Sequence, residues 1–221
     1  MVRAAIVAVA TVVAALVAVQ IWIPRSMAPP RGPLAATAPE GDAVGAATPA
    51  AQLVDMEGLP TRIIVEQGDN QLVDAEISLI QLDKKGWLAP PPGVAGWYGP
   101  PQWETRPGDL SPYRGIVVGH NVHRGQPDVF YKLGEVRGGA LIRMTFELDG
   151  LEEEATFRVL ADAVSAPKDV VTGEADDTYS WVWQSDRPER MITLISCDLD
   201  APHDPDGHSL NNWIVQAERV S

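Results

Sequence analysis

The chain has 221 residues, of which 45% are hydrophobic, and a formal net charge of −13 at pH 7. Its length allows one well-formed hydrophobic core after an N-terminal segment is set aside. The acidic balance argues against electrostatic binding of nucleic acid or of anionic lipid head groups, because both need clustered lysine and arginine.

The N-terminal segment is strongly apolar. Residues 4–23 contain only two polar residues, Thr11 and Gln20, and end beside Trp22. About 20 apolar residues in a helix span the hydrocarbon core of a bilayer, and tryptophan suits its interface. We therefore predict a transmembrane anchor over residues 1–24, with a cleavable signal peptide as the alternative. We expect a single-pass protein of the cell membrane, with the bulk of the chain outside the cytosol.

Residues 25–58 are rich in alanine, proline and glycine and have almost no aromatic side chains. Such a segment does not bury enough apolar area to offset its chain entropy. We expect a disordered linker here, followed by a folded domain over residues 59–221.

From Leu59 onward, short β-type runs alternate with turn residues. In the run 141–147, for example, Ile142, Met144 and Phe146 alternate with polar residues, which indicates a half-buried strand. The predicted strands are 61–66, 73–81, 115–119, 141–147, 156–161, 179–183, 191–197 and 212–220. Eight short strands without long helical periods predict an all-β fold. We expect a closed barrel, because closure removes exposed strand edges.

Two long loops separate the predicted strands, over residues 87–109 and 198–210, and long ordered loops are often functional. The second loop contains four acidic residues, Asp198, Asp200, Asp204 and Asp206. Carboxylate oxygens are ligands that Ca²⁺ prefers, but the spacing and the prolines do not fit an EF-hand loop. We expect a solvated acidic loop and no cofactor, with Ca²⁺ as the alternative.

Cys197 is the only cysteine of the chain, so it has no partner for an internal disulfide. It ends the apolar run 191–197 (M-I-T-L-I-S-C), and His120 directly follows a similar run over 115–119. A cysteine protease or transpeptidase needs a thiol and an imidazole, because the imidazole protonates the leaving amine. Side chains at strand ends are held rigidly enough for such chemistry. We predict Cys197 and His120 as the catalytic pair; the alternative is a buried structural cysteine.

Residues 193–197 (T-L-I-S-C) resemble the Thr-Leu-x-Thr-Cys signature of sortases, the cysteine transpeptidases of bacterial cell surfaces. Gly119-His120 resembles their Gly-His motif, and the separation 197 − 120 = 77 residues is similar to that of the family. Residues 95–98 (A-G-W-Y), 128–133 (D-V-F-Y-K-L) and 138–142 (G-G-A-L-I) are most similar to the class E and F branch.

The resemblance implies an eight-stranded sortase-like β-barrel with long loops, in a membrane-anchored enzyme that anchors proteins at the cell surface. Cys197 would attack a carbonyl in a surface-protein sorting signal of the Leu-Pro-x-Thr-Gly type. His120 would protonate the departing amine. An amine acceptor, such as a cell-wall peptide or a pilin lysine, would then resolve the thioacyl intermediate.

The sequence departs from this pattern at several positions. Ser196 replaces the usual threonine, Val122 stands where relatives often have aspartate, and an expected arginine is missing. Sortases carry an arginine on the strand after the cysteine loop, where this chain reads L-N-N-W-I-V-Q-A over residues 210–217. The arginine position falls on Asn212 or, in another alignment, on Leu210. We take Asn212 as the substrate or oxyanion group. Loss of one oxyanion donor typically costs about 10²–10³ in rate.

Several readings therefore remain open. An arginine from elsewhere, such as Arg114, Arg124 or Arg187, is a candidate for the missing charge. There are also two alternatives to an active transpeptidase. One is a catalytically degenerate sortase-fold module that binds peptides, and the other is a cysteine peptidase that uses water as the acceptor.

Overall fold

A computed structural model describes residues 53–171 and 177–221. The predicted anchor over residues 1–24, and the predicted linker up to residue 52, lie outside the described residues. Within the described ranges, no helix is both long enough and apolar enough to cross a membrane.

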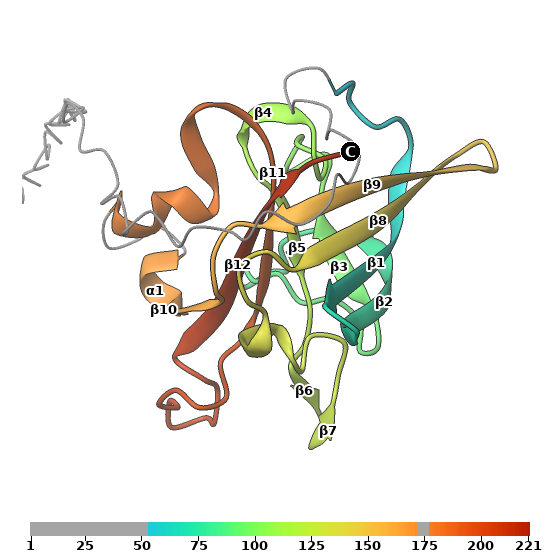
Figure 1. Cartoon of the computed structure of the whole chain (residues 1–221). Helices are drawn as coiled ribbons and strands as arrows, with labels where there is room; N and C mark the ends of the chain where they lie inside the picture. Colours follow the sequence, from blue (N-terminus) through green and yellow to red (C-terminus); the bar gives the residue numbers. More distant parts are fainter. Residues whose placement is uncertain (1–52, 172–176) are drawn as a thin grey trace, which may run out of the picture. The chain divides into compact units, whose positions relative to one another are not determined.

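The described residues form mainly strands, with a few short helices (Figure 1). The strands are β1 Leu59–Gln67, β2 Asn70–Ile80, β3 Ala95–Tyr98, β4 Leu110–Tyr113, β5 Gly115–Val118, β6 Val122–His123, β7 Gln126–Pro127, β8 Leu141–Leu148, β9 Leu151–Val159, β10 Val164–Pro167, β11 Gln184–Cys197 and β12 Asn211–Arg219. The short helices are η2 Leu133–Glu135, α1 Lys168–Val171 and η3 Asp177–Val182.

Eight of these strands close into a barrel. Their order is β12-β9-β8-β1-β2-β3-β5-β11, and a further pairing of β11 with β12 completes the ring. β10 and β4 pair at the outside of this ring, and β6 with β7 forms a separate hairpin. The predicted all-β, eight-stranded barrel is thus confirmed for the described part of the chain.

One predicted strand is wrong, and one barrel strand was not predicted. Residues 179–183 lie largely in the 3₁₀ helix η3, where Tyr179, Trp181 and Val182 pack against the barrel. Their β-type composition reflects burial and not extended backbone. The missing strand is β3, inside the predicted loop 87–109, and all four of its residues are buried. The prolines and glycines on both sides of β3 concealed it.

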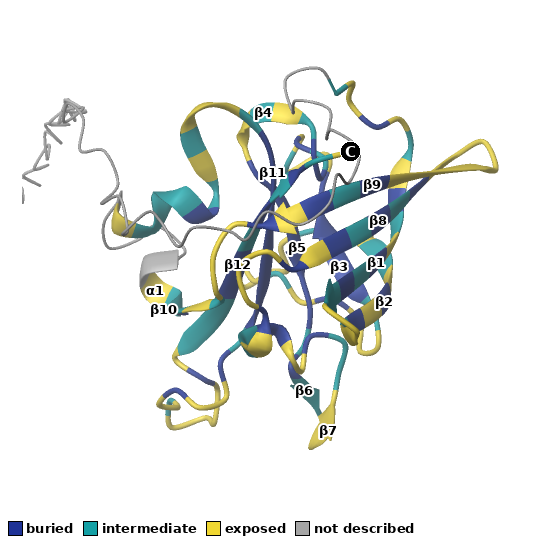
Figure 2. Ribbon diagram, viewed as in Figure 1, coloured by how far each residue is buried: buried dark blue, intermediate teal, exposed yellow. Residues whose placement is uncertain are grey.

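Two apolar clusters lie on opposite sides of the barrel wall. The first, which we call the interior core, takes alternate residues from strands all around the ring, including Ile192 and Leu194 of β11. The second, the outer cluster, contains Ile195 of β11 with Val118 and Ile214 from the neighbouring strands. The second half of β11 is therefore buried on both faces, as Figure 2 shows in dark blue. This explains the unbroken apolar run that ends at Cys197.

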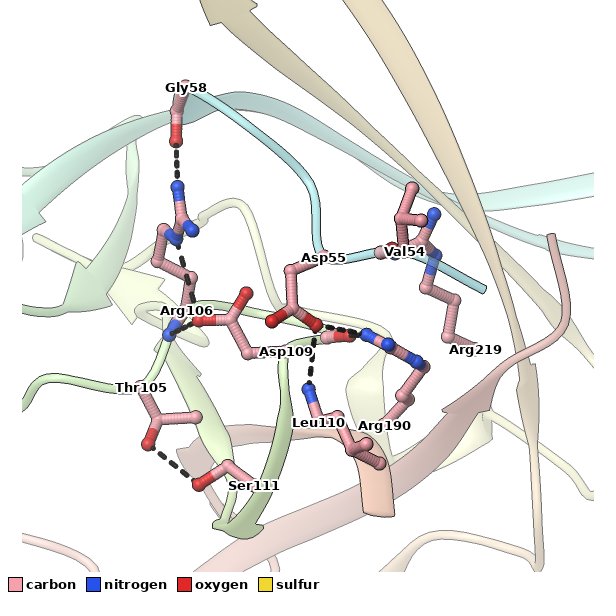
Figure 3. A network of polar contacts seen from close by, with 11 residues as sticks. Val54, Asp55, Gly58, Thr105, Arg106, Asp109, Leu110, Ser111, Arg190 and Arg219 are labelled. Carbon is pink, nitrogen blue, oxygen red and sulfur yellow. Dashed lines mark hydrogen bonds and ion pairs between the residues drawn. The ribbon is translucent and has the colours of Figure 1, made fainter. Parts of the chain in front are cut away.

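The ordered domain begins before Leu59. Residues 53–58, which we call the strap, pack on the barrel through Met56, which is buried. The strap also binds two buried arginines (Figure 3). Arg190 donates to the Asp55 carboxylate and to the carbonyl of Leu53, and Arg219 Nη1 donates to the carbonyl of Val54 at 2.7 Å.

Candidate active site

The register of β5 and β11 places Cys197 and His120 at the same end of the barrel. These strands run parallel, and Val118 pairs with Ile195 as their last partners. The N–H of Gly119 then donates to the carbonyl of Ile195 at 3.0 Å, which continues the ladder by one step. His120 and Cys197 each lie two residues beyond the last pair, so the two predicted catalytic residues emerge side by side.

Strand alternation places the thiol on the outer face. Cys197 shares its face of β11 with Ile195, which belongs to the outer cluster. The thiol therefore lies on the outside of the barrel wall, and Cys197 is partly exposed. His120 lies two residues beyond the end of β5.

Asn212 lies directly across from Cys197 in the antiparallel pairing of β11 with β12. Directly opposite residues of an antiparallel pair project from the same face. The register of Ile195 with Ile214, both in the outer cluster, confirms that this is the outer face. The third predicted residue is therefore next to the thiol. Leu210, the position of the other alignment, precedes β12 and is exposed.

A residue that sequence reasoning missed contacts the sulfur of Cys197. Lys168 Nζ is 3.6 Å from Cys197 Sγ. Lys168 opens α1 directly after β10, and the pairing of Pro167 with Asn211 brings that end of β10 to the start of β12. The backbone N–H of Lys168 donates to the carbonyl of Leu210 at 2.9 Å. No local sequence signal marks this lysine, because only the β10–β12 pairing brings it to the cysteine.

The arginines considered from the sequence occupy other places. Arg114 and Arg187 both pair with Glu189, at 2.8 Å and 2.9 Å. Glu189 belongs to the first half of β11, far along the strand from its end. Arg124 lies in the turn between β6 and β7. The positive charge found at the cysteine is an ammonium and not a guanidinium.

Backbone contacts fix the position of His120. Its Nε2 is 2.9 Å from the carbonyl of Pro90. A carbonyl only accepts hydrogen bonds, so this contact assigns the proton to Nε2 and leaves Nδ1 of the neutral ring as an acceptor. Asp128 Oδ1 accepts from the N–H of Gly93 at 3.0 Å, which holds the Pro90 loop. The imidazole thus has a defined orientation.

Asn121 links the two halves of the site. Its side-chain Nδ2 donates to the backbone carbonyl of Cys197 at 2.8 Å, and the backbone carbonyl of Asn121 accepts from the N–H of Asp128 at 2.9 Å. Asn121 is buried. The segment after His120 is therefore tied to the backbone of Cys197 itself.

The acidic loop after Cys197 does not form one cluster of four carboxylates. Asp198 is buried, and its carboxylate accepts from Ser165 Oγ at 2.5 Å and from the N–H of Asp200 at 3.0 Å. Ligand atoms of Asp204, Asp206 and His208 lie within 4.8 Å of one another. Exposed acidic groups of this kind often gather without an ion, so this grouping is not by itself evidence for a metal site.

The barrel presents a thiol and an imidazole at the ends of adjoining strands, and these are two groups that cysteine-dependent acyl transfer needs. The sequence model of the Sortase domain matches residues 71–220, well over half of the chain. The chain belongs to the sortase family.

Among solved structures, the chain is similar to the SrtA sortase from Actinomyces oris. The two are 15% identical with a TM-score of 0.45, over 76% of this chain and 83% of that chain. The comparison with curated proteins found no match.

Proposed function

We propose that this chain is a sortase-type cysteine transpeptidase acting on a sorting signal similar to Leu-Pro-x-Thr-Gly. The observation that carries the proposal is the β5–β11 register, which sets Cys197 and His120 two residues beyond one shared pair. A structural cysteine would need no imidazole at the neighbouring strand end. Family membership supports the same reaction type.

The first half of the reaction forms a thioester. The thiol of Cys197 gives its proton to His120, and the thiolate attacks the carbonyl carbon of the scissile peptide bond. The new C–S bond pushes one electron pair of the C=O bond onto oxygen. When the tetrahedral intermediate collapses, the C–N bond breaks, and the departing amine takes the proton from the His120 imidazolium.

The second half returns the enzyme to its starting state. The amine of the acceptor attacks the thioester carbonyl and passes one proton to His120. The C–S bond then breaks with its electron pair on sulfur, and sulfur takes the proton back from His120. A new amide bond remains in the product, and the Cys197 thiol is restored. We propose a cell-wall peptide or a pilin lysine as the acceptor. Thiol–imidazole chemistry of this kind needs no metal or organic cofactor.

Asn212 is proposed to contact the carbonyl oxygen of the substrate. Its position opposite Cys197 puts a side-chain amide donor on the face from which the thiol projects. An amide donates hydrogen bonds without a full charge, so its contribution falls below that of a charged donor.

We further propose that residues 4–23 anchor the enzyme in the cell membrane with the barrel outside. The apolar length of this run supports the proposal. Protease added to intact cells should then degrade the barrel while a cytosolic control protein survives. Survival of the barrel under these conditions would place it inside.

The activity is tested with the full-length chain, solubilised in a mild detergent because of its apolar N-terminal run. The substrate is a fluorogenic Leu-Pro-x-Thr-Gly peptide, with and without triglycine as the acceptor. We expect an acyl adduct on Cys197 by mass spectrometry and a ligated product in the presence of triglycine. Cys197→Ala should abolish both, and His120→Ala should lower turnover by about 10²–10⁴-fold.

Each other outcome selects a different function. Free acid as the only product, even with triglycine, would indicate a hydrolytic peptidase. Peptide binding without an adduct, and unchanged in Cys197→Ala, would indicate a binding module and would refute the enzyme proposal.

A further inference from the structure

We infer that Lys168 supplies the positive charge that holds Cys197 as a thiolate, in the place where the family pattern led us to look for an arginine. The inference rests on the proposed Cys–His chemistry. It starts from the contact of Lys168 Nζ with Cys197 Sγ at 3.6 Å. Nothing in the local sequence around Lys168 indicated this role.

A thiolate is the nucleophile in thiol chemistry, and a thiol is a poor one. An opposite charge within about 4–6 Å favours the charged form of a neighbouring group by a factor of roughly 10–1000. Lys168 is half-buried, so solvent screening places the expected factor near the lower end. Loss of this charge should therefore slow the reaction of Cys197 with an electrophile by about tenfold.

The other charged groups around the sulfur do not replace this ammonium. At the end of β5 lies His120, whose ring centroid is 6.1 Å from that of His123. Directly after β11 comes Asp198, whose carboxylate accepts hydrogen bonds from Ser165 and Asp200. On β12 the opposite residue, Asn212, is uncharged. In the described residues, Lys168 is the cation that contacts Sγ.

The surrounding structure holds Lys168 in this position. Ala166, two residues earlier, is fully buried in the outer cluster and pairs with Asn212. The N–H of Lys168 is held by the carbonyl of Leu210. The base of the side chain is therefore fixed to β12, beside the residue that faces Cys197.

Lys168 forms and breaks no bond in this role and keeps its proton throughout. The proton of the thiol goes to His120, and the ammonium offsets the charge left on sulfur. When sulfur attacks, that charge moves to the substrate oxygen, and it returns to sulfur when the thioester is resolved.

The test measures alkylation of Cys197 by iodoacetamide between pH 5 and pH 10 in the full-length chain. Because Cys197 is the only cysteine, the mass of the whole protein reports this one site. Lys168→Met should react about tenfold more slowly at pH 7 and should need a higher pH to reach its maximal rate. Lys168→Arg should stay within about threefold of the wild type, because it keeps the charge.

Lys84→Met is the matched control, since it removes one exposed lysine and the same charge elsewhere on the surface. Its alkylation profile should match that of the wild type. Thermal unfolding checks that each variant is folded. If Lys168→Met does not fold, Lys168→Gln serves as the uncharged variant in its place. Equal profiles for the wild type and a folded uncharged variant would overturn the inference. So would a Lys168→Arg variant as slow as Lys168→Met, because packing and not charge would then be responsible.

A second-site change gives an independent check. Asn212 faces Cys197 directly, so Asn212→Arg brings a new charge to the thiol from the opposite strand. In the Lys168→Met background it should restore most of the lost alkylation rate. A double variant as slow as Lys168→Met would count against a charge effect.

Alkylation involves no sorting peptide, so the two proposals fail separately. A Lys168-dependent alkylation profile without any peptide product would leave the inference standing and refute the proposed function. Ligated product with an alkylation profile that does not depend on Lys168 would support the proposed function and refute the inference about Lys168.

Discussion

At the scale of single residues, the lack of a side chain at Gly119 decides how His120 is held. A Cβ at this position would lie 2.6 Å from Cγ of Phe130, which is fully buried. The N–H of Phe130 donates to the carbonyl of His120 at 2.9 Å. The glycine before His120 thus lets the Phe130 ring pack directly against the backbone at position 119.

Gly119→Ala should therefore force Phe130 or the backbone to move. We expect a loss of about 1–3 kcal/mol in the free energy of unfolding. Turnover should fall at temperatures where the variant is still folded, because His120 moves with the backbone. Urea denaturation and peptide ligation measure the two effects. Adding Phe130→Leu should recover part of the turnover by making room, and a fully active Gly119→Ala would contradict this account.

Asn121 offers a second test at this scale. Its hydrogen bond to the Cys197 carbonyl is buried, so Asn121→Ala should cost about 1–2 kcal/mol of stability. If the bond also sets the thiol against the imidazole, the rate of acylation should fall while peptide binding stays the same. Stability that drops without any change in the acylation rate would assign Asn121 a structural role alone.

At the scale of elements, the strap joins the barrel through charge as well as packing. Burial raises the pKa of Asp55, but the N–H of Leu110 and the Arg190 guanidinium outweigh it, so the pKa lies below its ordinary value. For such an acid, the stabilisation is complete above the unfolded-state pKa of about 3.9. It is lost as the pH falls through the lower value of the folded state.

Asp55→Asn should accordingly destabilise the protein at pH 7 and pH 5 and should make no difference well below pH 4. Because the Asp55 side chain is 51% exposed, we expect an effect of only about 1 kcal/mol. Urea denaturation at the three pH values checks this, with the exposed Asp186→Asn as the control. An equal loss at every pH would show that charge is not the cause.

Asp109, beside the strap, has the opposite effect on stability at neutral pH. Burial raises its pKa, and the hydrogen bond from the Arg106 N–H only partly offsets this. Its ionised form therefore costs folding free energy at neutral pH, and this cost is relieved as the pH falls through the raised pKa. These two carboxylates therefore change the stability with pH in opposite directions.

At the scale of the whole molecule, the strap folds together with the barrel. A chain beginning at residue 59 loses the buried Met56 and the Leu53 and Val54 carbonyls that satisfy two buried arginines. We expect it to be about 3–5 kcal/mol less stable than a chain beginning at residue 53. Denaturation midpoints of the two chains measure the difference. Equal midpoints would mean that the arginines find other partners.

Much of the barrel could be predicted because strands carry a local signal. The alternation in β8 and the unbroken apolar run in β11 each reflect which faces are buried, and both were read correctly. β3 and η3 were not predicted correctly. β3 is a short strand between glycines and prolines, and η3 is an aromatic turn packed on the barrel, so neither has a distinctive hydrophobic period. Tertiary packing overrides local preference in such segments.

The proposed catalytic pair could be predicted from the sequence for the same reason. Cys197 ends a recognisable strand, His120 comes just after another, and the chain has no other cysteine to consider. Lys168 was not within reach, since it stands 29 residues from Cys197 and meets it through the pairing of β10 with β12. A register between distant strands depends on the whole barrel and not on the residues around one lysine. The sequence by itself was thus enough to predict Cys197 as the nucleophile and His120 as its imidazole, because each belongs to a recognisable local pattern. Only the tertiary structure shows which cation contacts the Cys197 sulfur, because that contact depends on strand pairing.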